Sequence, residues 1–565
     1  MTQRFTLRPY QRDAIRAVVD GRKRGLRRML IALPTGSGKT VIFSELARMA
    51  RRPVLVLAHR TELVQQAADK LGRALGDPKL VAVEQGSLRA PDGVKAVVAS
   101  IRSLHSRRLA RLREARDFGL VIYDECHHAA ADDNKRVLEE LGCFDPDWAG
   151  TLLGFTATPN RADGLGLDDI FEEIAYTRDL HQMVDDKYLV PLRGFRIQTA
   201  ADLERVRPAG RDLDVETLSE AVDIEDRNAL VARSIQELAR DRRTIAFCVT
   251  VAHATNLAKA LAVLGVPSGI VHGKLKAEDR AMVLRAFREE RIQVLTNVGV
   301  LTEGFDDPAV ACIAMARPTR SEALYAQCVG RGTRLHEGKS DCLVLDFVDL
   351  SDLELVSLPS LMGMPRDMDL EGREVGEAEK TWRQLLFDYP GFELEAGAIT
   401  LAEIQARAQA FDPLSMEVDP EIRAISGNGW ESLGPAGLCL HLFRSRKAAG
   451  EGRLTAIEVL RLGRGKDKWH VLIGGQKVAG FSKVAQAVEA TDFEVQRMGR
   501  VAMVTALPEA EWRQEAVPPE LVDRLADLRR PRRAASWAEA LRLLGFERHA
   551  RRRRGGRRRG ARLRT

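Results

Sequence analysis

The fold is decided by the stretch ALPTGSGKT at residues 32–40. An apolar run at residues 29–32 leads into it and another follows at residues 41–43, so the stretch is predicted to join a strand to a helix through a tight glycine turn. Such a turn binds phosphate, because its backbone N–H groups and the helix N-terminus converge on one point. The residues expected to contact phosphate are Thr35, Gly36, Ser37, Gly38, Lys39 and Thr40.

Two residues at the end of this stretch have separate expected roles. Lys39 can reach the outer phosphates of a nucleotide, and Thr40 offers a hydroxyl to a magnesium ion. The strict phosphate-loop pattern has glycine where this chain has Leu33, so a glycine-rich turn without a ligand is the alternative. Other residues must therefore complete a nucleotide site.

Length and composition indicate a multidomain globular protein. With 565 residues, 45% of them hydrophobic, the chain can form several domains that each bury a core. Its seven cysteines include no CxxC pair, which argues against both a disulfide framework and a zinc ribbon. No apolar run approaches the ~20 residues of a membrane span and no signal peptide is recognisable, so we expect a soluble, cytoplasmic protein without a membrane partner.

The net charge of +7 comes from the C-terminus. Ten arginines and no acidic residue lie between Arg548 and Thr565, so the rest of the chain is slightly acidic. The segment at residues 551–565 is predicted to be a disordered arm that binds a polyphosphate such as nucleic acid. A solubilising terminus without a target is the alternative interpretation.

Polar residues follow several predicted strands in the first part of the chain. The buried strands are expected at residues 54–58, 94–99, 120–123 and 151–155. Just after three of them stand Arg60, Ser100 and the pair Asp124-Glu125. Ligands bind at the carboxyl ends of strands in parallel α/β sheets, where Asp124 can hold magnesium and Glu125 can orient an attacking water. The adjacent Cys126, His127 and His128 lack the distant partner that a tetrahedral metal site needs.

Strand and helix alternation restarts at Thr244 and brings a second set of polar residues. The set consists of Thr296, Asn297, Gly304, Asp306, Gln327, Arg331 and Arg334. The two arginines face one way if helical, either as a solvated surface or as arginine fingers that a second lobe carries to the γ-phosphate. Near the N-terminus a helix is predicted from Pro9, with Gln11 on its exposed first turn, where an amide can hydrogen-bond a purine edge.

In this order the blocks resemble the motifs of superfamily 2 helicases and translocases, over roughly residues 7 to 346. Gln11 resembles the adenine-reading Q motif, residues 36–40 motif I, residues 124–127 an acidic motif II spelled DECH, and residues 156–158 motif III. Thr296-Asn297 through Gly304 and Asp306 resemble motif V, and Gln327, Gly330, Arg331 and Arg334 resemble motif VI.

The resemblance implies an α/β fold of two tandem RecA-like parallel-sheet lobes, with ATP and Mg2+ in the cleft between them and nucleic acid across both. It implies that ATP is bound by Gln11, residues 35–40, Gly304 and Asp306, and that Mg2+ is held by Thr40 and Asp124. The implied catalytic residues are Lys39, Asp124, Glu125, Gln327, Arg331 and Arg334. The implied contacts to nucleic-acid phosphates are Arg60, Ser100, Thr296 and Asn297.

The spelling of these motifs favours a DNA motor. Pro34 before the glycine turn and the DECH sequence resemble XPB-like and type I restriction motors rather than DEAD-box RNA helicases. We therefore expect an ATP-dependent DNA helicase or double-strand translocase that acts on duplex, forked or single-stranded DNA in repair or recombination. An RNA helicase, favoured only by the arginine and glycine tail, and a nucleic-acid-binding protein with a vestigial ATP site are the alternatives.

Composition shifts divide the chain into six expected parts. The first lobe is expected at residues 1–205, the second at 206–350, and an acidic linker or helical brace at 351–414. Short apolar runs between turns predict a β-rich accessory domain at 415–515, followed by a short helical module at 516–550 and the arginine-rich tail.

Overall fold

The computed structural model describes residues 6–548 apart from 60, 130, 158–166, 211, 303, 352, 390–398, 411, 413, 415, 463–467, 529–532, 546, 547. Arg60, Thr158 and the arginine-rich tail thus lie outside the described residues. The chain divides into two compact units, Met1–Ala378 and Glu379–Thr565, and the division falls within helix α13 (Val375–Asp388). In the described part, no helix has both the length and the apolar character to cross a membrane.

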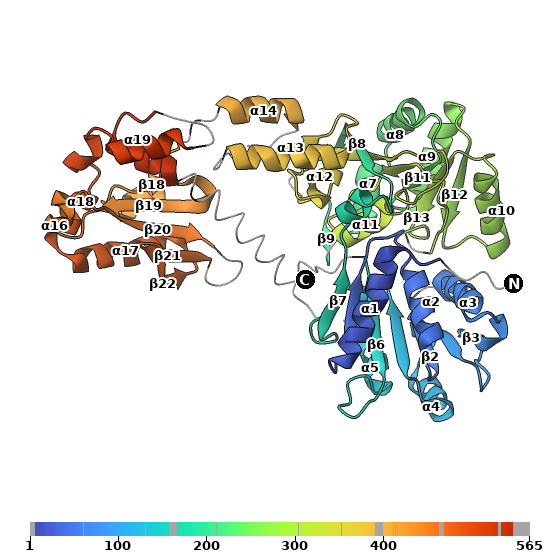
Figure 1. Cartoon of the computed structure of the whole chain (residues 1–565). Helices are drawn as coiled ribbons and strands as arrows, with labels where there is room; N and C mark the ends of the chain where they lie inside the picture. The colour runs from blue at the N-terminus through green and yellow to red at the C-terminus, as the bar shows by residue number, and fades with distance from the viewer. Residues whose placement is uncertain are drawn as a thin grey trace. The chain divides into compact units, whose positions relative to one another are not determined.

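The first unit begins with a lobe built on a seven-stranded parallel sheet, which we call lobe 1 (Figure 1). In spatial order its strands are β3 (Val81–Glu84), β4 (Ala96–Ser100), β2 (Val54–Ala58), β5 (Leu120–Asp124), β6 (Thr151–Thr156), β1 (Arg28–Ala32) and β7 (Glu173–Thr177). All neighbours pair in parallel, so the carboxyl ends of the strands meet at one edge.

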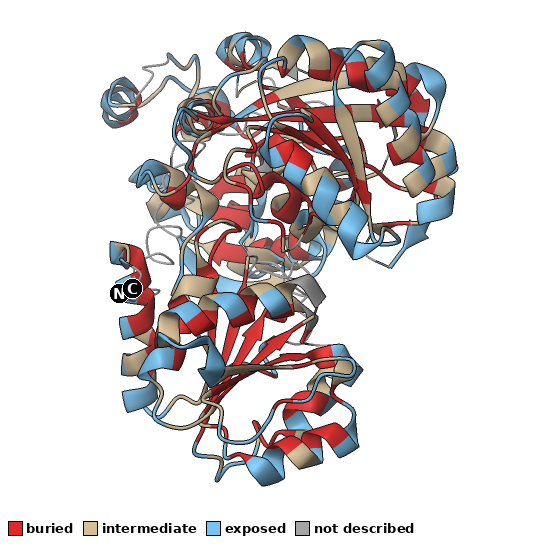
Figure 2. Cartoon of the chain, turned by 90° about the vertical axis from the view of Figure 1, so that its right-hand side faces the viewer, coloured by how far each residue is buried: buried red, intermediate tan, exposed pale blue. Residues whose placement is uncertain are grey.

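Helices cover both faces of this sheet. One face packs against α1 (Pro9–Lys23), α2 (Lys39–Met49) and α3 (Thr61–Leu75), and the other against α4 (Ser106–Ala115) and α5 (Asp132–Glu140). Strand β2 is apolar throughout because Val54 and Val56 enter one core while Leu55 and Leu57 enter the other. Figure 2 shows such strands as buried between helices with exposed outer faces. Each fully buried aliphatic side chain contributes roughly 1.5–3 kcal/mol.

The second lobe of this unit, lobe 2, has a six-stranded parallel sheet. In spatial order its strands are β12 (Ser268–His272), β13 (Val294–Val298), β11 (Thr244–Phe247), β14 (Cys312–Met315), β15 (Cys342–Leu350) and β8 (Leu192–Asp202). Its helices are α7 (Val215–Val222), α8 (Glu225–Leu238), α9 (Val251–Val263), α10 (Ala277–Arg288) and α11 (Glu322–Val329). The predicted pair of parallel-sheet lobes is confirmed.

Strand β8 corrects the predicted border between the lobes. The sequence division placed residues up to 205 in lobe 1, but β8 pairs in parallel with β15 at the edge of the second sheet. Asp349 of β15 forms a buried two-bond ion pair with Arg227 of α8, at 2.7 and 2.9 Å, and also accepts a hydrogen bond from Thr199 of β8. Lobe 2 therefore begins before Leu192, and the other predicted boundaries stay predictions.

The second unit contains the predicted β-rich part as an antiparallel sheet. Its strands follow chain order: β18 (Glu431–Ser432), β19 (Gly437–Leu442), β20 (Thr455–Arg461), β21 (Trp469–Ile473) and β22 (Gln476–Phe481). Helices α17 (Val484–Met498) and α18 (Arg500–Ala506) share one core with this sheet. Helices α14 (Leu401–Ala410), α15 (Pro420–Ile425) and α19 (Pro519–Ala526) belong to the same unit.

Candidate nucleotide site between the two lobes

A phosphate loop joins β1 to α2, as predicted. Gly36 and Gly38 adopt φ angles of 86° and 77°, in the left-handed region that favours glycine. This backbone lets the chain curl from the end of β1 into the first turn of α2, which begins at Lys39. The N–H groups of that first turn have no partner within the helix, so they can bind an anion.

Two hydroxyl groups in this loop are buried without a hydrogen-bond partner. They are Thr35 Oγ1 and Ser37 Oγ, on residues that are 6% and 1% exposed. Buried polar atoms normally have a partner, and an orphaned pair in one loop points to a ligand with several acceptor oxygens. A polyphosphate fits these donors, whereas a turn that is only structural leaves them unexplained.

Lys39 and Glu125 form the charged centre of the site. The Lys39 ammonium lies 3.3 Å from Glu125 Oε1 and 3.4 Å from the carbonyl oxygen of Leu33, and both side chains are buried. Burial acts to raise the pKa of Glu125, but the charge of Lys39, the hydrogen bond and charge of His127 and the charge of Arg331 hold this pKa well below its ordinary value. Glu125 therefore stays ionised at neutral pH.

Asp124 is the last residue of β5 and stands at the same edge of the sheet. Its Oδ1 accepts a hydrogen bond from the N–H of Glu125 at 3.1 Å, and Glu125 itself has a left-handed φ of 51°. A carboxylate from Asp124 and the hydroxyl of Thr40, in the first turn of α2, are oxygen donors of the kind that Mg2+ prefers, so the pair fits this ion.

Gln11 lies against the phosphate loop, but it is buried rather than on the exposed turn that the sequence predicted. Only 4% of it is exposed. Its Oε1 accepts a hydrogen bond from the N–H of Arg8 at 2.9 Å, which caps α1, and its Nε2 lies 3.5 Å from the carbonyl oxygen of Ser37. Tyr10, which the sequence did not single out, donates to the same carbonyl. The first turn of α1 thus supports the loop from the side.

Lobe 2 reaches this loop through residues 330–334. A Cβ at Gly330 would lie 2.5 Å from Thr35 Cβ, so only glycine allows this approach. A Cβ at Gly36 would lie 3.1 Å from Arg334 Cγ, which puts the stem of Arg334 beside the phosphate loop. The N–H of Val190, in the segment between the two sheets, donates to the carbonyl oxygen of Thr333 at 2.8 Å.

The two predicted arginines are held by the loop that precedes β14. Arg331 donates to the carbonyl oxygens of Thr302 and Phe305, at 2.7 and 2.9 Å. Arg334 donates to Phe305 O at 3.1 Å and pairs with Asp306 Oδ1 at 2.7 Å. Arg331 is 5% exposed, yet its charge lowers the pKa of Glu125 in lobe 1. Lobe 2 therefore brings basic groups close to the phosphate loop and to Glu125 of lobe 1.

Helix α3 of lobe 1 makes a second contact with lobe 2. Gln66 donates to the carbonyl oxygen of Gly304, and the Lys70 ammonium lies 3.4 Å from Asp306 Oδ2. Burial opposes the ionisation of Asp306, but Arg334 and Lys70 together lower its pKa. Gln66 and Lys70 were missed by the sequence analysis, because polar residues on an exposed helix face carry no signal of a partner.

The other described candidates for site residues lie on three different elements of the two lobes. Gln327 is buried on α11, and Ser100 ends β4 at the carboxyl edge of the first sheet. Thr296 and Asn297 are fully buried in β13, and their expected contact with nucleic-acid phosphates stays a prediction. Asn297 Oδ1 accepts from the N–H of Leu301 at 3.0 Å, so Asn297 shapes the turn after the strand.

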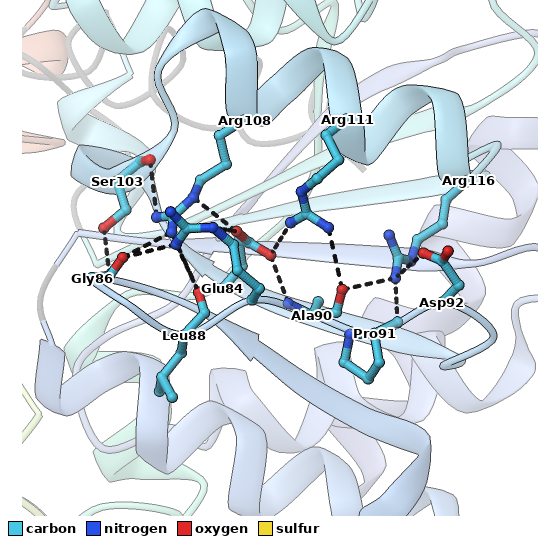
Figure 3. Close-up of polar contacts among 11 residues, drawn as sticks. Glu84, Gly86, Leu88, Ala90, Pro91, Asp92, Ser103, Arg108, Arg111 and Arg116 are labelled. Carbon is cyan, nitrogen blue, oxygen red and sulfur yellow. Dashed lines mark hydrogen bonds and ion pairs between the residues drawn. The ribbon is translucent and has the colours of Figure 1, made fainter.

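A buried charge cluster at the end of β3 was also missed (Figure 3). Glu84 is completely buried, and its two carboxylate oxygens lie 2.8 Å from Arg108 Nε and 2.6 Å from Arg111 Nη2. It also accepts from the N–H of Ala90 at 2.8 Å, while Arg108 donates to the carbonyl oxygen of Gly86 at 2.8 Å. Helix α4 thus holds the loop after β3. The sequence pattern could have revealed Glu84, because this residue ends an apolar strand as Asp124 does.

Replacing Glu84 by glutamine is expected to lower the free energy of unfolding by about 3–5 kcal/mol, because two guanidinium groups lose their buried counter-charge. Denaturant unfolding monitored by circular dichroism measures the change. Glu114, exposed on the same helix, provides the matched control Glu114→Gln, which should unfold as the wild type does. Equal unfolding midpoints for Glu84→Gln and wild type would contradict this role of the cluster.

Comparison with known proteins matches both lobes. The family model for the res subunit of type III restriction enzymes matches residues 4–161, and that for the helicase conserved C-terminal domain matches residues 226–336. Saccharomyces cerevisiae IRC3, named as an ATP-dependent helicase, is 33% identical over 65% of this chain and 54% of its own length. Schizosaccharomyces pombe irc3, named as a mitochondrial ATP-dependent helicase, is 36% identical over 64% of this chain and 60% of its own length.

A more distant relative is the type I restriction enzyme EcoAI endonuclease subunit of Escherichia coli. It is 26% identical over 67% of this chain and 50% of its own length. The chain thus spans between half and two thirds of the lengths of these curated relatives.

Proposed function

Because this chain belongs to the superfamily 2 helicases and translocases, we propose that it is an ATP-dependent DNA helicase or double-strand DNA translocase. The observation that carries the proposal is the approach of Arg331 and Arg334 of lobe 2 to the phosphate loop and Glu125 of lobe 1. In the proposal this arrangement supplies positive charge to a bound triphosphate from both lobes, which a binding protein without hydrolysis does not need.

Different residues of the site have different roles in the proposed hydrolysis. In the proposal, the loop N–H groups and the Lys39 ammonium bind the β- and γ-phosphates, and ionised Glu125 orients the attacking water. Arg331 and Arg334 stabilise the charge that develops on the transferred phosphoryl group. Thr40 and Asp124 would hold Mg2+, whose charge offsets that of the phosphates when it is bound.

Lobe contacts connect this chemistry to movement along nucleic acid. Asp306 stands between Arg334 of its own lobe and Lys70 of lobe 1, so a shift of Arg334 toward phosphate changes the pairing across the lobes. Among the described candidates, the proposed contacts to nucleic-acid phosphates are Ser100, which ends β4, and Thr296 and Asn297 of β13. Alternate closing and opening of the lobes would then move the protein along a strand.

DNA is the proposed track, and repair or recombination the proposed setting. The match to a restriction-enzyme family and the similarity to a type I restriction endonuclease subunit support DNA over RNA. An RNA helicase is the second candidate, supported by the arginine and glycine tail.

A substrate-panel ATPase measurement tests the proposal. Steady-state hydrolysis is measured without nucleic acid and with single-stranded DNA, duplex DNA, forked DNA or single-stranded RNA of equal nucleotide concentration. Duplex or forked DNA should raise kcat most, because in a DNA motor the binding of DNA favours closure of the ATP site between the lobes. Stimulation by RNA alone would favour the second candidate, and the absence of stimulation by any of the four would contradict a motor function.

A further inference from the structure

Lys339 lies in the short segment that joins Arg334 to β15 and has no role in the site described so far. Its ammonium donates two hydrogen bonds to backbone carbonyls, to Arg334 O at 2.9 Å and to Pro308 O at 3.1 Å. Its own N–H donates to the carbonyl oxygen of His336 at 3.1 Å, which closes a turn. One side chain thus binds the backbone of Arg334 and that of the loop before β14.

This loop, residues 304–308, already contacts the two arginines from the other side. Both Arg331 and Arg334 donate to the carbonyl oxygen of Phe305, at 2.9 and 3.1 Å. The guanidinium groups therefore fix one end of the contact between the two segments, and the Lys339 ammonium fixes the other. Without Lys339, Arg334 keeps its guanidinium contacts but loses the anchor on its backbone, so the side chain can shift together with the main chain.

We propose that Lys339 is a positioning residue that fixes the backbone of Arg334 and so sets where the Arg334 guanidinium stands at the phosphate loop. The inference rests on the proposed function, because it assigns Lys339 to the hydrolysis that Arg334 supports. Arg334 Cγ would lie 3.1 Å from a Cβ on Gly36, so small displacements of Arg334 change its distance to the loop. A misplacement of about 1 Å at a catalytic group can cost about 100-fold in rate.

The pKa of Lys339 makes the proposal testable through the pH dependence of kcat. Burial lowers the pKa of Lys339 to about 8, with Cys342 and Asp307 acting to raise it and Arg334 and Arg242 to lower it. Below this pH the group is an ammonium that donates charge-assisted hydrogen bonds, which are about twice as strong as neutral ones. Above it the neutral amine binds the two carbonyls more weakly. Stimulated kcat should therefore fall as pH rises through 8.

Three variants test this role in the full-length protein, with duplex DNA as the stimulating probe. Lys339→Met removes the donor at similar length, and Lys339→Arg keeps a positive charge, since the guanidinium pKa lies above about 12. Lys259→Met is the matched control, because Lys259 is exposed on α9 of the same lobe. For each variant, kcat and the KM for ATP are measured between pH 7 and pH 9.5, together with the thermal midpoint.

Lys339→Met should lower kcat roughly 10- to 100-fold with little change in the KM for ATP, and Lys259→Met should match the wild type. Lys339→Arg should restore most of kcat and remove the decline above pH 8. An unchanged kcat in Lys339→Met overturns the proposal. So does an alkaline decline of kcat in Lys339→Arg that equals that of wild type. Because each variant tests the proposal separately, poor folding of one leaves the other as a test. Wild-type protein that hydrolyses no ATP overturns the proposed function and this inference together.

Discussion

The Lys39→Ala variant is expected to lose nucleic-acid-stimulated ATP hydrolysis, with kcat about 100- to 1,000-fold below wild type. In the proposed mechanism the Lys39 ammonium binds the outer phosphates, and it lies 3.3 Å from Glu125 in a buried position. Its removal leaves the developing phosphate charge without this partner. Steady-state ATPase with saturating duplex DNA measures the effect, and binding of labelled duplex DNA should be largely retained.

Lys259→Ala serves as the control for this experiment, because Lys259 is exposed on α9 and far in sequence from the site. Removing Lys39 also leaves Glu125 buried without its cation, so the thermal midpoint of each variant is recorded. Lys39→Arg keeps a positive charge beside Glu125 but presents it in the shape of a guanidinium. It therefore separates the loss of the phosphate contact from the loss of the counter-charge of Glu125. If a folded Lys39→Ala protein hydrolysed ATP at the wild-type rate, the proposed role of the phosphate loop in hydrolysis would be wrong.

The Arg334→Ala variant is expected to lower kcat about 1,000-fold, at the lower end of the effect of an arginine finger. Arg334 contacts the phosphate loop through its stem and pairs with Asp306, and it makes fewer backbone contacts than Arg331. The loss should therefore fall on hydrolysis more than on folding. Single-turnover ATP hydrolysis with duplex DNA measures the chemical step.

Arg288→Ala is the matched control, because Arg288 is exposed on α10 of the same lobe. It should hydrolyse ATP as the wild type does. If Arg334→Ala retained a kcat within a few-fold of wild type with an unchanged thermal midpoint, Arg334 would be part of a surface and not of the site. In that case Arg331 alone would remain as a candidate finger.

The positions of residues that follow from local pattern were predicted well, while their roles stay predictions. The phosphate loop and Asp124 were recognisable because each follows an apolar strand, and parallel strands place their carboxyl ends together. The strand predicted at residues 54–58 coincides with β2, since a strand buried on both faces is apolar without interruption. The same pattern identifies Glu84 after β3, but only its burial reveals that it is paired.

Roles that depend on packing between distant segments could not be predicted. Strand β8 reads as a continuation of lobe 1, and only its pairing with β15 assigns it to lobe 2. Thr296 and Asn297 lie inside β13, which ends at Val298, and their complete burial follows from packing that the local sequence does not reveal. Lys339 and Lys70 have no distinguishing sequence pattern, because Pro308 O and the Asp306 carboxylate, which they contact, lie far away in the chain.

The hydrogen bond from Val190 to Thr333 gives the connector between the lobes a mechanical role. The chain leaves lobe 1 after β7 and enters lobe 2 at β8, so Val190 lies in the covalent link between the lobes. Thr333 stands between Arg331 and Arg334 in sequence. If the lobes rotate as the proposed mechanism requires, this bond would carry the movement of the connector to the main chain between the two arginines.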